Sequence, residues 1–345
     1  MHLRIAIQMD PIELVDINAD STFRIMEEAQ LRGHELYYYN PEQLAFEEGE
    51  ITAHGWPISV DRVKGKHFTK GEFTKVNLKN FDVVWLRQDP PFDMGYITNT
   101  HLLEMVHPDT LVVNDPKWVR NYPEKLLVLN FPDLTPPTTI ARDIEILKTF
   151  KNKYKDIILK PLYGNGGAGV FRLDENDRNL NSLHELFSSI NTEPLIAQKF
   201  LAAVSKGDKR IILVDGEPVG AINRVPAKGE TRSNMHVGGR PEKVELDERD
   251  LEICEKIGPL LRKKGQIFVG IDVIGGFLTE INVTSPTGIQ ELERFNEINV
   301  AEKIWLSIES KFLKILLTLN ILQFLSPRCS KCVILRLSIW KLIAL

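Results

Sequence analysis

Apolar and polar positions follow two periods along the chain, and together they predict an α/β fold. Short apolar runs typical of buried strands occupy residues 3–9, 34–39, 82–87 and 111–113. Between the first two runs, Phe23, Met26 and Ala29 recur at helical spacing, and Gly33 ends the predicted helix 21–32. Strands that alternate with helices favour a parallel sheet, and the mixed segment 49–75 predicts a hairpin insertion.

Prolines between residues 122 and 137 mark a predicted domain boundary. Beyond it, the predicted strands are 156–161, 170–173, 194–200, 210–214, 219–225, 266–274 and 277–283, and the predicted helices are 143–153, 180–190, 247–264 and 289–308. The dipeptide Asp215-Gly216 is typical of a tight hairpin turn, so the strands on either side of it are expected to pair.

Charge divides the chain into two unequal parts. The 345 residues include 43 Lys and Arg against 47 Asp and Glu, a formal net charge of −4. The last 35 residues hold six of the basic residues, no acidic residue and 22 residues of the hydrophobic set. The first 310 residues therefore keep 37 basic against 47 acidic residues and carry −10, while the tail carries +6. The acidic charge of these first 310 residues, called the body below, argues against nucleic-acid binding.

The predicted location is the cytoplasm. The chain opens on a strand-like run followed by Asp10, which is unlike a signal peptide. The longest uncharged run, residues 315–327, has 13 residues against the roughly 20 that a membrane-spanning helix needs, so no integral membrane segment is predicted. Three cysteines cannot form a disulfide framework, which favours a reducing compartment.

A glycine cluster at residues 163–169 (YGNGGAG) offers the first candidate chemistry. It matches the G-x-G-x-x-G dinucleotide fingerprint, but that fingerprint precedes a helix, whereas residues 170–173 predict a strand. The pattern indicates either a hairpin loop whose N–H groups cover phosphates or a glycine-rich surface turn. Lys160, at the end of the apolar run 157–159, favours the phosphate interpretation over a lysine that merely extends to solvent.

Two carboxylates and an amide interrupt apolar strands near the end of the body. Glu280 and Asn282 are two residues apart and share one face of their strand. A three-residue hairpin loop would place Asp272 opposite Glu280, whereas a two-residue turn on Gly275-Gly276 would place it on the other face. In the first register three oxygen donors form a set suited to Mg²⁺ bound with nucleotide phosphates. A solvated polar face is the alternative, which the apolar neighbours disfavour because unpaired buried carboxylates are costly.

Basic residues gather around the polar, glycine-bearing stretch 226–239. They are Lys206, Lys209, Arg210, Arg224, Lys228, Arg232 and Arg240. The stretch predicts a mobile lid that brings cations to developing negative charge. A solvated loop and a nucleic-acid patch are the competing interpretations, and the acidic body disfavours the second.

Together these motifs resemble the ATP-grasp carboxylate–amine ligases, and most specifically the bacterial glutathione synthetase family. The segments that carry the resemblance are 9–11 (MDP), 86–93 (LRQDPPFD), 133–136 (DLTP), 157–169 (IILKPLYGNGGAG), 208–210 (DKR), 214–218 (VDGEP), 229–232 (GETR) and 268–286 (FVGIDVIGGFLTEINVTSP). The resemblance implies an α/β protein in which an N-terminal parallel-sheet (pre-ATP-grasp) domain is followed by a two-part ATP-grasp fold. The implied domains are 1–122 (substrate domain), 123–200 (central lid subdomain) and 201–310 (catalytic subdomain), with an atypical apolar, basic tail at 311–345 outside the resemblance.

The resemblance also implies an activity. ATP phosphorylates the cysteinyl carboxylate of γ-glutamylcysteine, the amine of glycine attacks the acyl phosphate, and glutathione, ADP and phosphate are released. The expected cation is Mg²⁺ or Mn²⁺, the expected partners are these small molecules, and a homo-oligomer is expected. The alternatives are a related ligase with another acceptor and an ATP-binding protein with impaired catalysis, and retention of Glu280, Asn282 and Arg232 argues against the second.

Site residues follow from positions in the family. Those implied for ATP are Lys125 and Lys160 on the phosphates, the covering loop Gly164, Asn165, Gly166, Gly167, Ala168 and Gly169, the adenine-cleft residues Gln198, Lys199 and Leu201, and Asp208 near the ribose. Those implied for the metal are Asp272, Glu280 and Asn282, those for the acyl phosphate Arg210, Arg224 and Arg232, and those for the dipeptide Arg87, Asp89 and Ser285. No general base for the glycine amine is evident from the sequence.

The cysteines give little indication of a metal or redox site. Cys329 and Cys332 form a lone C-x-x-C without the further pair that a zinc site needs. Cys254 lies on an apolar helical stripe and is predicted to be a buried core thiol.

Overall fold

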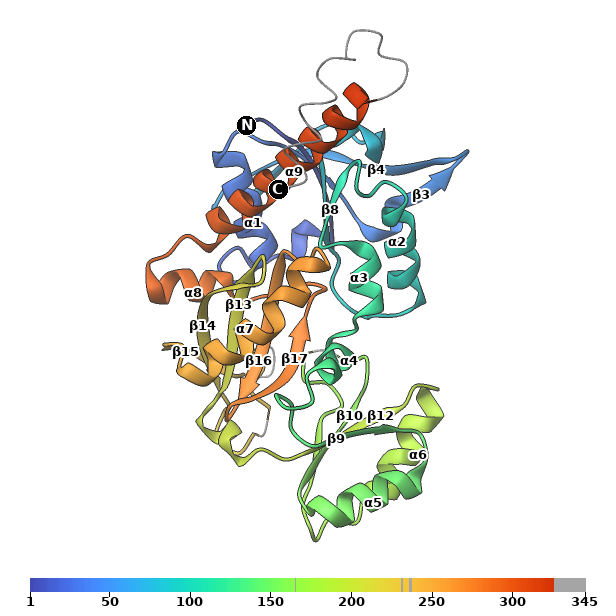
Figure 1. Ribbon diagram of the computed structural model, residues 1–345, viewed down its shortest axis with the longest axis vertical. Helices are drawn as coiled ribbons and strands as arrows, with labels where there is room; N and C mark the ends of the chain where they lie inside the picture. Colours follow the sequence, from blue (N-terminus) through green and yellow to red (C-terminus); the bar gives the residue numbers. More distant parts are fainter. Residues whose placement is uncertain (165, 231, 236–237, 326–345) are drawn as a thin grey trace.

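The computed structural model describes residues 1–325 apart from 165, 231, 236 and 237, with side chains up to residue 318. Cys329, Cys332 and the rest of 326–345 lie outside the described residues. In the described part, three sheets follow one another along the long axis of the molecule (Figure 1). Since the N-terminal sheet and the sheet of the last third lie side by side, residues far apart in sequence can meet between them.

The N-terminal sheet is parallel at its centre, as predicted. Its strands are β1 (Arg4–Met9), β2 (Glu35–Tyr39), β3 (Leu44–Glu47), β4 (Glu50–Val60), β5 (Phe68–Lys70), β6 (Thr74–Asn77), β7 (Val83–Arg87) and β8 (Leu111–Val113). The order is β3-β4-β2-β1-β7-β8, and β5 and β6 pair antiparallel with β4, which confirms the hairpin insertion. Every residue of β7 is buried, as expected for a strand covered on both faces.

Helices cover this sheet and lead to the next. They are α1 (Ser21–Leu31), α2 (Met94–Glu104), α3 (Pro116–Asn121) and α4 (Glu124–Leu127). The Asp20 side chain accepts a hydrogen bond from the backbone N–H of Phe23 and so caps α1. The short α4 packs against strand β17 (Phe277–Asn282) of the last sheet and positions Lys125 there.

The central unit is a small antiparallel sheet with its own core. It consists of β9 (Thr138–Ala141), α5 (Ile144–Tyr154), β10 (Ile157–Pro161), β11 (Phe171–Leu173), α6 (Leu180–Ile190) and β12 (Leu195–Lys199), with strand order β11-β10-β12-β9. Leu147, Ile157, Leu159 and Leu173 are buried between sheet and helices. The glycine cluster connects β10 to β11, so a strand follows it, as predicted.

The last sheet is antiparallel in the order β15-β14-β13-β16-β17. Its other strands are β13 (Asp208–Val214), β14 (Glu217–Val225), β15 (Arg240–Val244) and β16 (Phe268–Ile274), and α7 (Glu248–Lys263) packs on it. The turn at Asp215-Gly216 joins β13 to β14, which confirms that hairpin.

The predicted helix 289–308 is wrong in its bounds. The chain forms α8 (Ile289–Asn296) and α9 (Val300–Leu325), separated where Glu297 adopts a left-handed φ of 53°. The helix α9 continues without interruption past residue 310. None of the helices in the described residues is long and apolar enough to cross a membrane.

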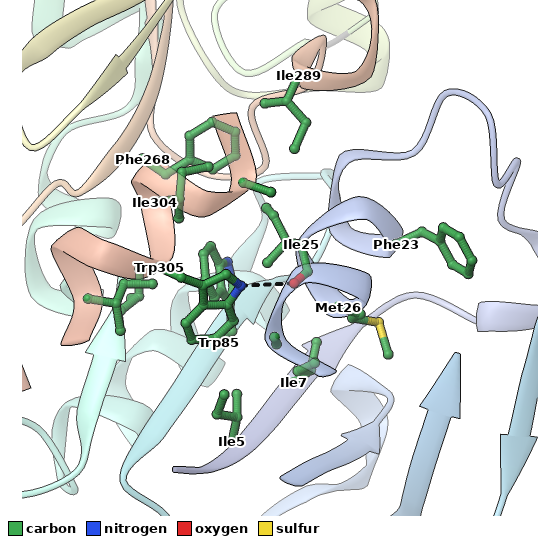
Figure 2. Packing of buried hydrophobic residues seen from close by; sticks show 14 of the residues in the cluster. Ile5, Ile7, Phe23, Ile25, Met26, Trp85, Phe268, Ile289, Ile304 and Trp305 are labelled. Carbon is green, nitrogen blue, oxygen red and sulfur yellow. Dashed lines mark hydrogen bonds between the residues drawn. The ribbon is translucent and has the colours of Figure 1, made fainter. Parts of the chain in front are cut away.

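One core joins the N-terminal sheet to the last third of the chain. Figure 2 shows Trp305 of α9 against Trp85 of β7, and its indole N–H donates a 2.9 Å hydrogen bond to the carbonyl oxygen of Ile25. Phe268 and Ile289 belong to the same cluster as Ile5 and Ile7. Packing across this core holds the two sheets together.

Candidate active site

A cleft with an empty volume of about 890 Å³ lies between the central unit and the last sheet. Its walls come from β10, β12, β13, β16 and β17 and from the loops that follow β10 and β14. The predicted site residues that line it are Lys125, Lys160, Gly164, Gly166, Gly167, Ala168, Gln198, Lys199, Leu201, Asp208, Arg232, Asp272 and Glu280. Gly169 stands at the end of the same loop, and Asn165 lies outside the described residues.

The β16–β17 hairpin resolves the two registers left open by the sequence. Ile274 pairs with Phe277, so the turn is the two-residue Gly275-Gly276. The register then shifts by one residue, and Asp272 nevertheless pairs with Glu280. A β-bulge at Thr279 supplies the extra residue. The short turn and the facing carboxylates are therefore compatible.

Glu280 lies between two lysines from different parts of the fold. Its Oε1 is 3.6 Å from Nζ of Lys125 on α4 and 3.6 Å from Nζ of Lys160 at the end of β10. Burial lowers the pKa of Lys160, an effect that Glu280 opposes. Burial pushes the pKa of Glu280 up, but the two ammonium groups outweigh it and the pKa is lowered. Two ammonium groups against one carboxylate leave a positive charge that suits phosphate.

A second ionic cluster lies along β13. Arg210 binds both oxygens of Asp272, at 2.5 Å through Nε and 3.1 Å through Nη2. Arg224 bridges Asp208 at 2.5 Å and Asp272 at 3.0 Å. Burial opposes ionisation of Asp272, yet the two guanidinium groups hold its pKa far below the ordinary value. Burial raises the pKa of Asp208 to about 6, which Arg224 opposes and Asp272 reinforces.

Strand alternation removes one predicted basic residue from the site. Asp208 and Arg210 are buried on the cleft side of β13, whereas Lys209 pairs with Asp247 at 3.1 Å and with Asp250 at the start of α7. Arg240 is exposed and pairs with Glu242. The basic residues grouped by the sequence therefore divide: Arg232 lines the cleft, whereas Arg210 and Arg224 are buried behind it against the lining residues Asp272 and Asp208.

The proposed metal ligands fit a cation to different degrees. Asn282 donates its amide N–H to Gly270 O at 3.1 Å, which leaves Oδ1 as an acceptor. Asp272 has both oxygens engaged by Arg210. No cluster of three or more His, Cys, Asp and Glu side chains suited to a metal occurs within the described residues. Glu280 and Asn282 thus offer hard oxygen donors, and phosphate oxygens would complete the coordination of a cation bound to them.

Two glycine-bearing loops face each other across the cleft. Arg232, from the loop after β14, donates to Gly167 O at 3.3 Å, and Ser233 donates to Asp208 at 2.8 Å. Gly167 has φ +82°, and a Cβ there would lie 2.9 Å from Oδ1 of Asn234. Only glycine fits this approach. The lysine of α4, Lys125, donates to Gly164 O and fixes the other end of the loop.

Several lining residues escaped sequence reasoning because they carry no chemical signature. These are Pro136, Ile158, Val170, Phe200, Val204, Ser233, Asn234, Ile274 and Thr279. Ile158 could have been found, since it lies two residues from Lys160 on β10 and shares its face. The Gln198 side chain donates to Thr138 Oγ1 at 3.1 Å, and the backbone N–H of Lys199 donates to Pro137 O at 2.9 Å, so one side-chain and one backbone hydrogen bond hold the end of β12 at the cleft.

The residues predicted for the dipeptide lie outside this cleft, at the junction with the N-terminal sheet. Arg87 is buried at the end of β7 and donates to Thr22 Oγ1 at 2.9 Å and Pro286 O at 3.1 Å. Its Nη1 has no partner among the described residues. Ser285 is the neighbour of Pro286, and the exposed Asp89 follows β7, where its N–H donates to Asp10. The contacts bring Arg87 next to the segment that contains Ser285.

Comparison with known families shows to which family this chain belongs. The model of the prokaryotic glutathione synthetase N-terminal domain matches residues 3–120, and the model of the prokaryotic glutathione synthetase ATP-grasp domain matches residues 124–297. The chain belongs to the prokaryotic glutathione synthetase family. It is thus an ATP-grasp ligase of glutathione biosynthesis, and the predicted fold, enzyme class and use of ATP are confirmed.

Relatives in the glutathione synthetase family match over nearly their whole length. The glutathione synthetase of Brucella melitensis biotype 1 is 57% identical over 311 residues, which is 90% of this chain and 100% of the relative. That of Synechococcus elongatus is 41% identical over 318 residues, covering 89% of this chain and 98% of the relative.

Solved structures agree on the fold. D-cycloserine synthetase DcsG superimposes with a TM-score of 0.65 at 13% identity, covering 90% of this chain and 99% of that one. ATP-grasp ligase PsnB complexed with its minimal precursor gives 0.60 at 18% identity, covering 89% and 98%. At these identities the likeness concerns architecture alone, and it is the architecture of ATP-grasp ligases.

Proposed function

We propose that the chain joins the cysteinyl carboxylate of γ-glutamylcysteine to the amine of glycine through an acyl phosphate, and that the site residues act as follows. The observation that carries the proposal is the meeting of Lys125 and Lys160 around Glu280 beside the Arg210–Asp272–Arg224 cluster. Two lysines thus line the cleft, and two arginines lie behind it on the lining residue Asp272. Phosphoryl transfer depends mainly on such positioning and charge stabilisation, without a protein nucleophile.

ATP binds with its triphosphate against Lys125 and Lys160 and beneath the loop 164–169. The base lies near Gln198, Lys199 and Leu201, among apolar side chains such as Ile158 and Ile274. The buried Asp208, close to the end of β12, faces the ribose. The two opposed glycine-bearing loops exclude water from the phosphates, and this favours transfer to the carboxylate over hydrolysis.

Arg210, Arg224 and Arg232 stabilise the charge that builds up on the acyl phosphate and on the tetrahedral intermediate. Two of these guanidinium groups are already held by Asp272 and Asp208, so they are oriented before the substrate arrives. Arg232 comes from the facing loop, where Glu230 pairs with it at 2.7 Å. Movement of this loop as a lid brings the third cation to the site.

Glu280 and Asn282, with Asp272 behind them, hold a divalent cation, for which we propose Mg²⁺ and name Mn²⁺ as the alternative. When bound there, such a cation would neutralise phosphate oxygens and align them for in-line transfer. Arg87, Asp89 and Ser285 bind the dipeptide, and the unpartnered Nη1 of the buried Arg87 is available for a substrate carboxylate.

Phosphate release from ATP tests the acceptor. With γ-glutamylcysteine present, release is expected to require glycine and to equal the glutathione formed, as measured by mass spectrometry. Release that proceeds with alanine or glutamate would instead favour a related ligase with another acceptor. Release without any acceptor or binding of ATP without turnover would contradict the ligation.

We also propose the cytoplasm as the compartment and a homo-oligomer as the assembly. The buried, unpaired thiol of Cys254 agrees with a reducing compartment. Light scattering of the purified chain tests the assembly, with a mass above 39.4 kDa expected.

A further inference from the structure

A second, smaller pocket adjoins the cleft where the three sheets meet. Its empty volume is about 310 Å³, and it shares Lys125 and Gly164 with the larger cleft. The remaining walls come from the loop after β7, the first turn of α4, the start of the loop after β10 and Thr284 beyond β17. The pocket therefore reaches from the N-terminal sheet to the residues proposed to hold phosphate.

Glu124 supplies the carboxylate of this pocket. Its Oε1 accepts a 2.6 Å hydrogen bond from the hydroxyl of Thr284. Its Oε2 has no hydrogen-bond partner among the described residues, so one oxygen is fixed and the other is available. Burial raises the pKa of Glu124, and repulsion by Glu280 adds to this. Lys125 and the hydrogen bond from Thr284 oppose this rise only in part, so a further cation near Oε2 would stabilise the charged form of Glu124.

Most of the other walls are apolar and leave little room. The rings of Phe92 and Tyr163 stack with centroids 5.9 Å apart and planes 29° apart. Pro90 and Leu162 also line the pocket. The charged groups among the described lining residues are Glu124 and Lys125, and the Lys125 ammonium group is engaged by Glu280 and by the carbonyl oxygen of Gly164. A small molecule whose ammonium group faces Glu124 fits between the narrow apolar walls, whereas a bulky side chain would collide with the rings.

We propose that this pocket binds the amino acceptor and that Glu124 holds its ammonium group and removes a proton from it. This inference rests on the proposed function. One ammonium proton moves to Oε2 of Glu124, and the freed lone pair attacks the carbonyl carbon of the acyl phosphate. The new C–N bond gives the tetrahedral intermediate, which collapses when the bond between its carbon and the phosphate oxygen breaks, and phosphate leaves with that electron pair. A second proton from the nitrogen goes to the departing phosphate, and Glu124 then releases its own proton to water.

The variant Glu124→Gln tests the role, because it keeps an acceptor for Thr284 and removes the charge. We expect kcat/KM for glycine to fall about 10²-fold or more, the range of general base catalysis. Positional isotope exchange in ATP, run with γ-glutamylcysteine and no glycine, reports acyl-phosphate formation and should be unchanged. Glu124→Asp should restore part of the glycine rate. The exposed Glu255 provides a matched control, and Glu255→Gln should leave both rates unchanged.

Hydroxylamine separates proton removal from positioning. It is largely unprotonated at neutral pH, so hydroxamate formation by Glu124→Gln should be impaired at least about tenfold less than the reaction with glycine. Full glycine activity in Glu124→Gln, equal impairment with both acceptors, or loss of the isotope exchange would overturn the inference. A wild-type chain that forms acyl phosphate but no glutathione would overturn the proposed function as well.

Discussion

Glu280 has an environment that a merely structural carboxylate would not need. It is half-buried between two lysines, one on α4 and one on β10, and it pairs across the hairpin with Asp272. Each charge is costly to bury alone, and the cluster becomes balanced only when phosphate and a cation enter. Glu280 is therefore expected to contact the cation and to lie beside the lysines that bind the nucleotide phosphates.

Replacement of this carboxylate gives a direct prediction. Glu280→Gln is expected to lower kcat by about 10²-fold or more, because it removes a ligand that contributes several kcal/mol of charge stabilisation through the cation. Steady-state kinetics and circular dichroism measure activity and folding together. Glu217→Gln, on the surface beside Arg262, serves as the control. Wild-type turnover by Glu280→Gln would refute the metal assignment.

The structure brings together the charged residues that the sequence grouped, and their roles stay a prediction. They could be grouped because phosphate chemistry leaves few choices of side chain. The residue types and the spacing of Lys160, Asp272 and Glu280 are enough to indicate what they could bind. Sequence reasoning missed Ile158 and Val204, which line the cleft through shape alone, and it overlooked Glu124, whose environment depends on Thr284, 160 residues away. Its grouping of Lys209 with the site failed because alternation along β13 turns that side chain toward α7.

The helix α9, near the end of the chain, stabilises the fold by packing on the N-terminal sheet and on α1. Trp305 is fully buried, packs on Trp85 with ring centroids 5.2 Å apart and donates to α1. Trp305→Ala is expected to lower the free energy of unfolding by about 3–5 kcal/mol, because it leaves a large cavity. Urea denaturation followed by circular dichroism measures this change. The adjacent Leu306 is half exposed, and Leu306→Ala should change stability little. Equal effects of the two variants would contradict the stabilising role of the buried Trp305.

The same helix makes stability dependent on pH through His34. Burial lowers the pKa of His34 from its ordinary 6.5, although Glu309, 3.1 Å away, opposes the shift. The unfolded chain thus takes up a proton at a higher pH than the folded one, and stability falls as pH drops below 6.5. Unfolding free energies at several pH values should fall less steeply in His34→Gln than in wild type. Parallel curves would show that His34 does not contribute.

Two elements show where local patterns are insufficient. The helix α2 contains the polar and β-branched run 98–100, which has low helix propensity, yet Tyr96, Thr100 and Leu103 are buried and Asp93 caps it. Tertiary packing therefore outweighs the local preference. In the β16–β17 hairpin, the turn residues indicated a register that the bulge at Thr279 then changes.

At the scale of the whole molecule, the composition break near residue 310 does not coincide with a break in structure. Phe312 is buried and Ile315 packs on the main core, whereas Leu317 is 60% exposed. Lys311 forms a 2.7 Å ion pair with Asp215. The helix thus remains part of the body for some residues beyond the predicted boundary, and that boundary stays a prediction for the function of the tail.

Two truncations test this division. Ending the chain after Thr318 should leave activity and thermal stability unchanged, because Phe312 and Ile315, which pack on the main core, remain. Ending it after Ser307 removes Ile308, Glu309 and Phe312 and should destabilise the fold by about 2–5 kcal/mol for each buried apolar side chain lost. Calorimetry and activity assays of both chains measure the difference. A stable, active chain ending at Ser307 would contradict the proposed packing role.

The central claim is ligation through an acyl phosphate in the cleft between the central unit and the last sheet. It is tested most directly with γ-glutamylcysteine labelled with ¹⁸O in the cysteinyl carboxylate, incubated with ATP, Mg²⁺ and glycine. The account predicts that each glutathione formed is accompanied by one phosphate that carries one ¹⁸O atom from that carboxylate. Unlabelled phosphate, or labelled phosphate without glutathione, would contradict it.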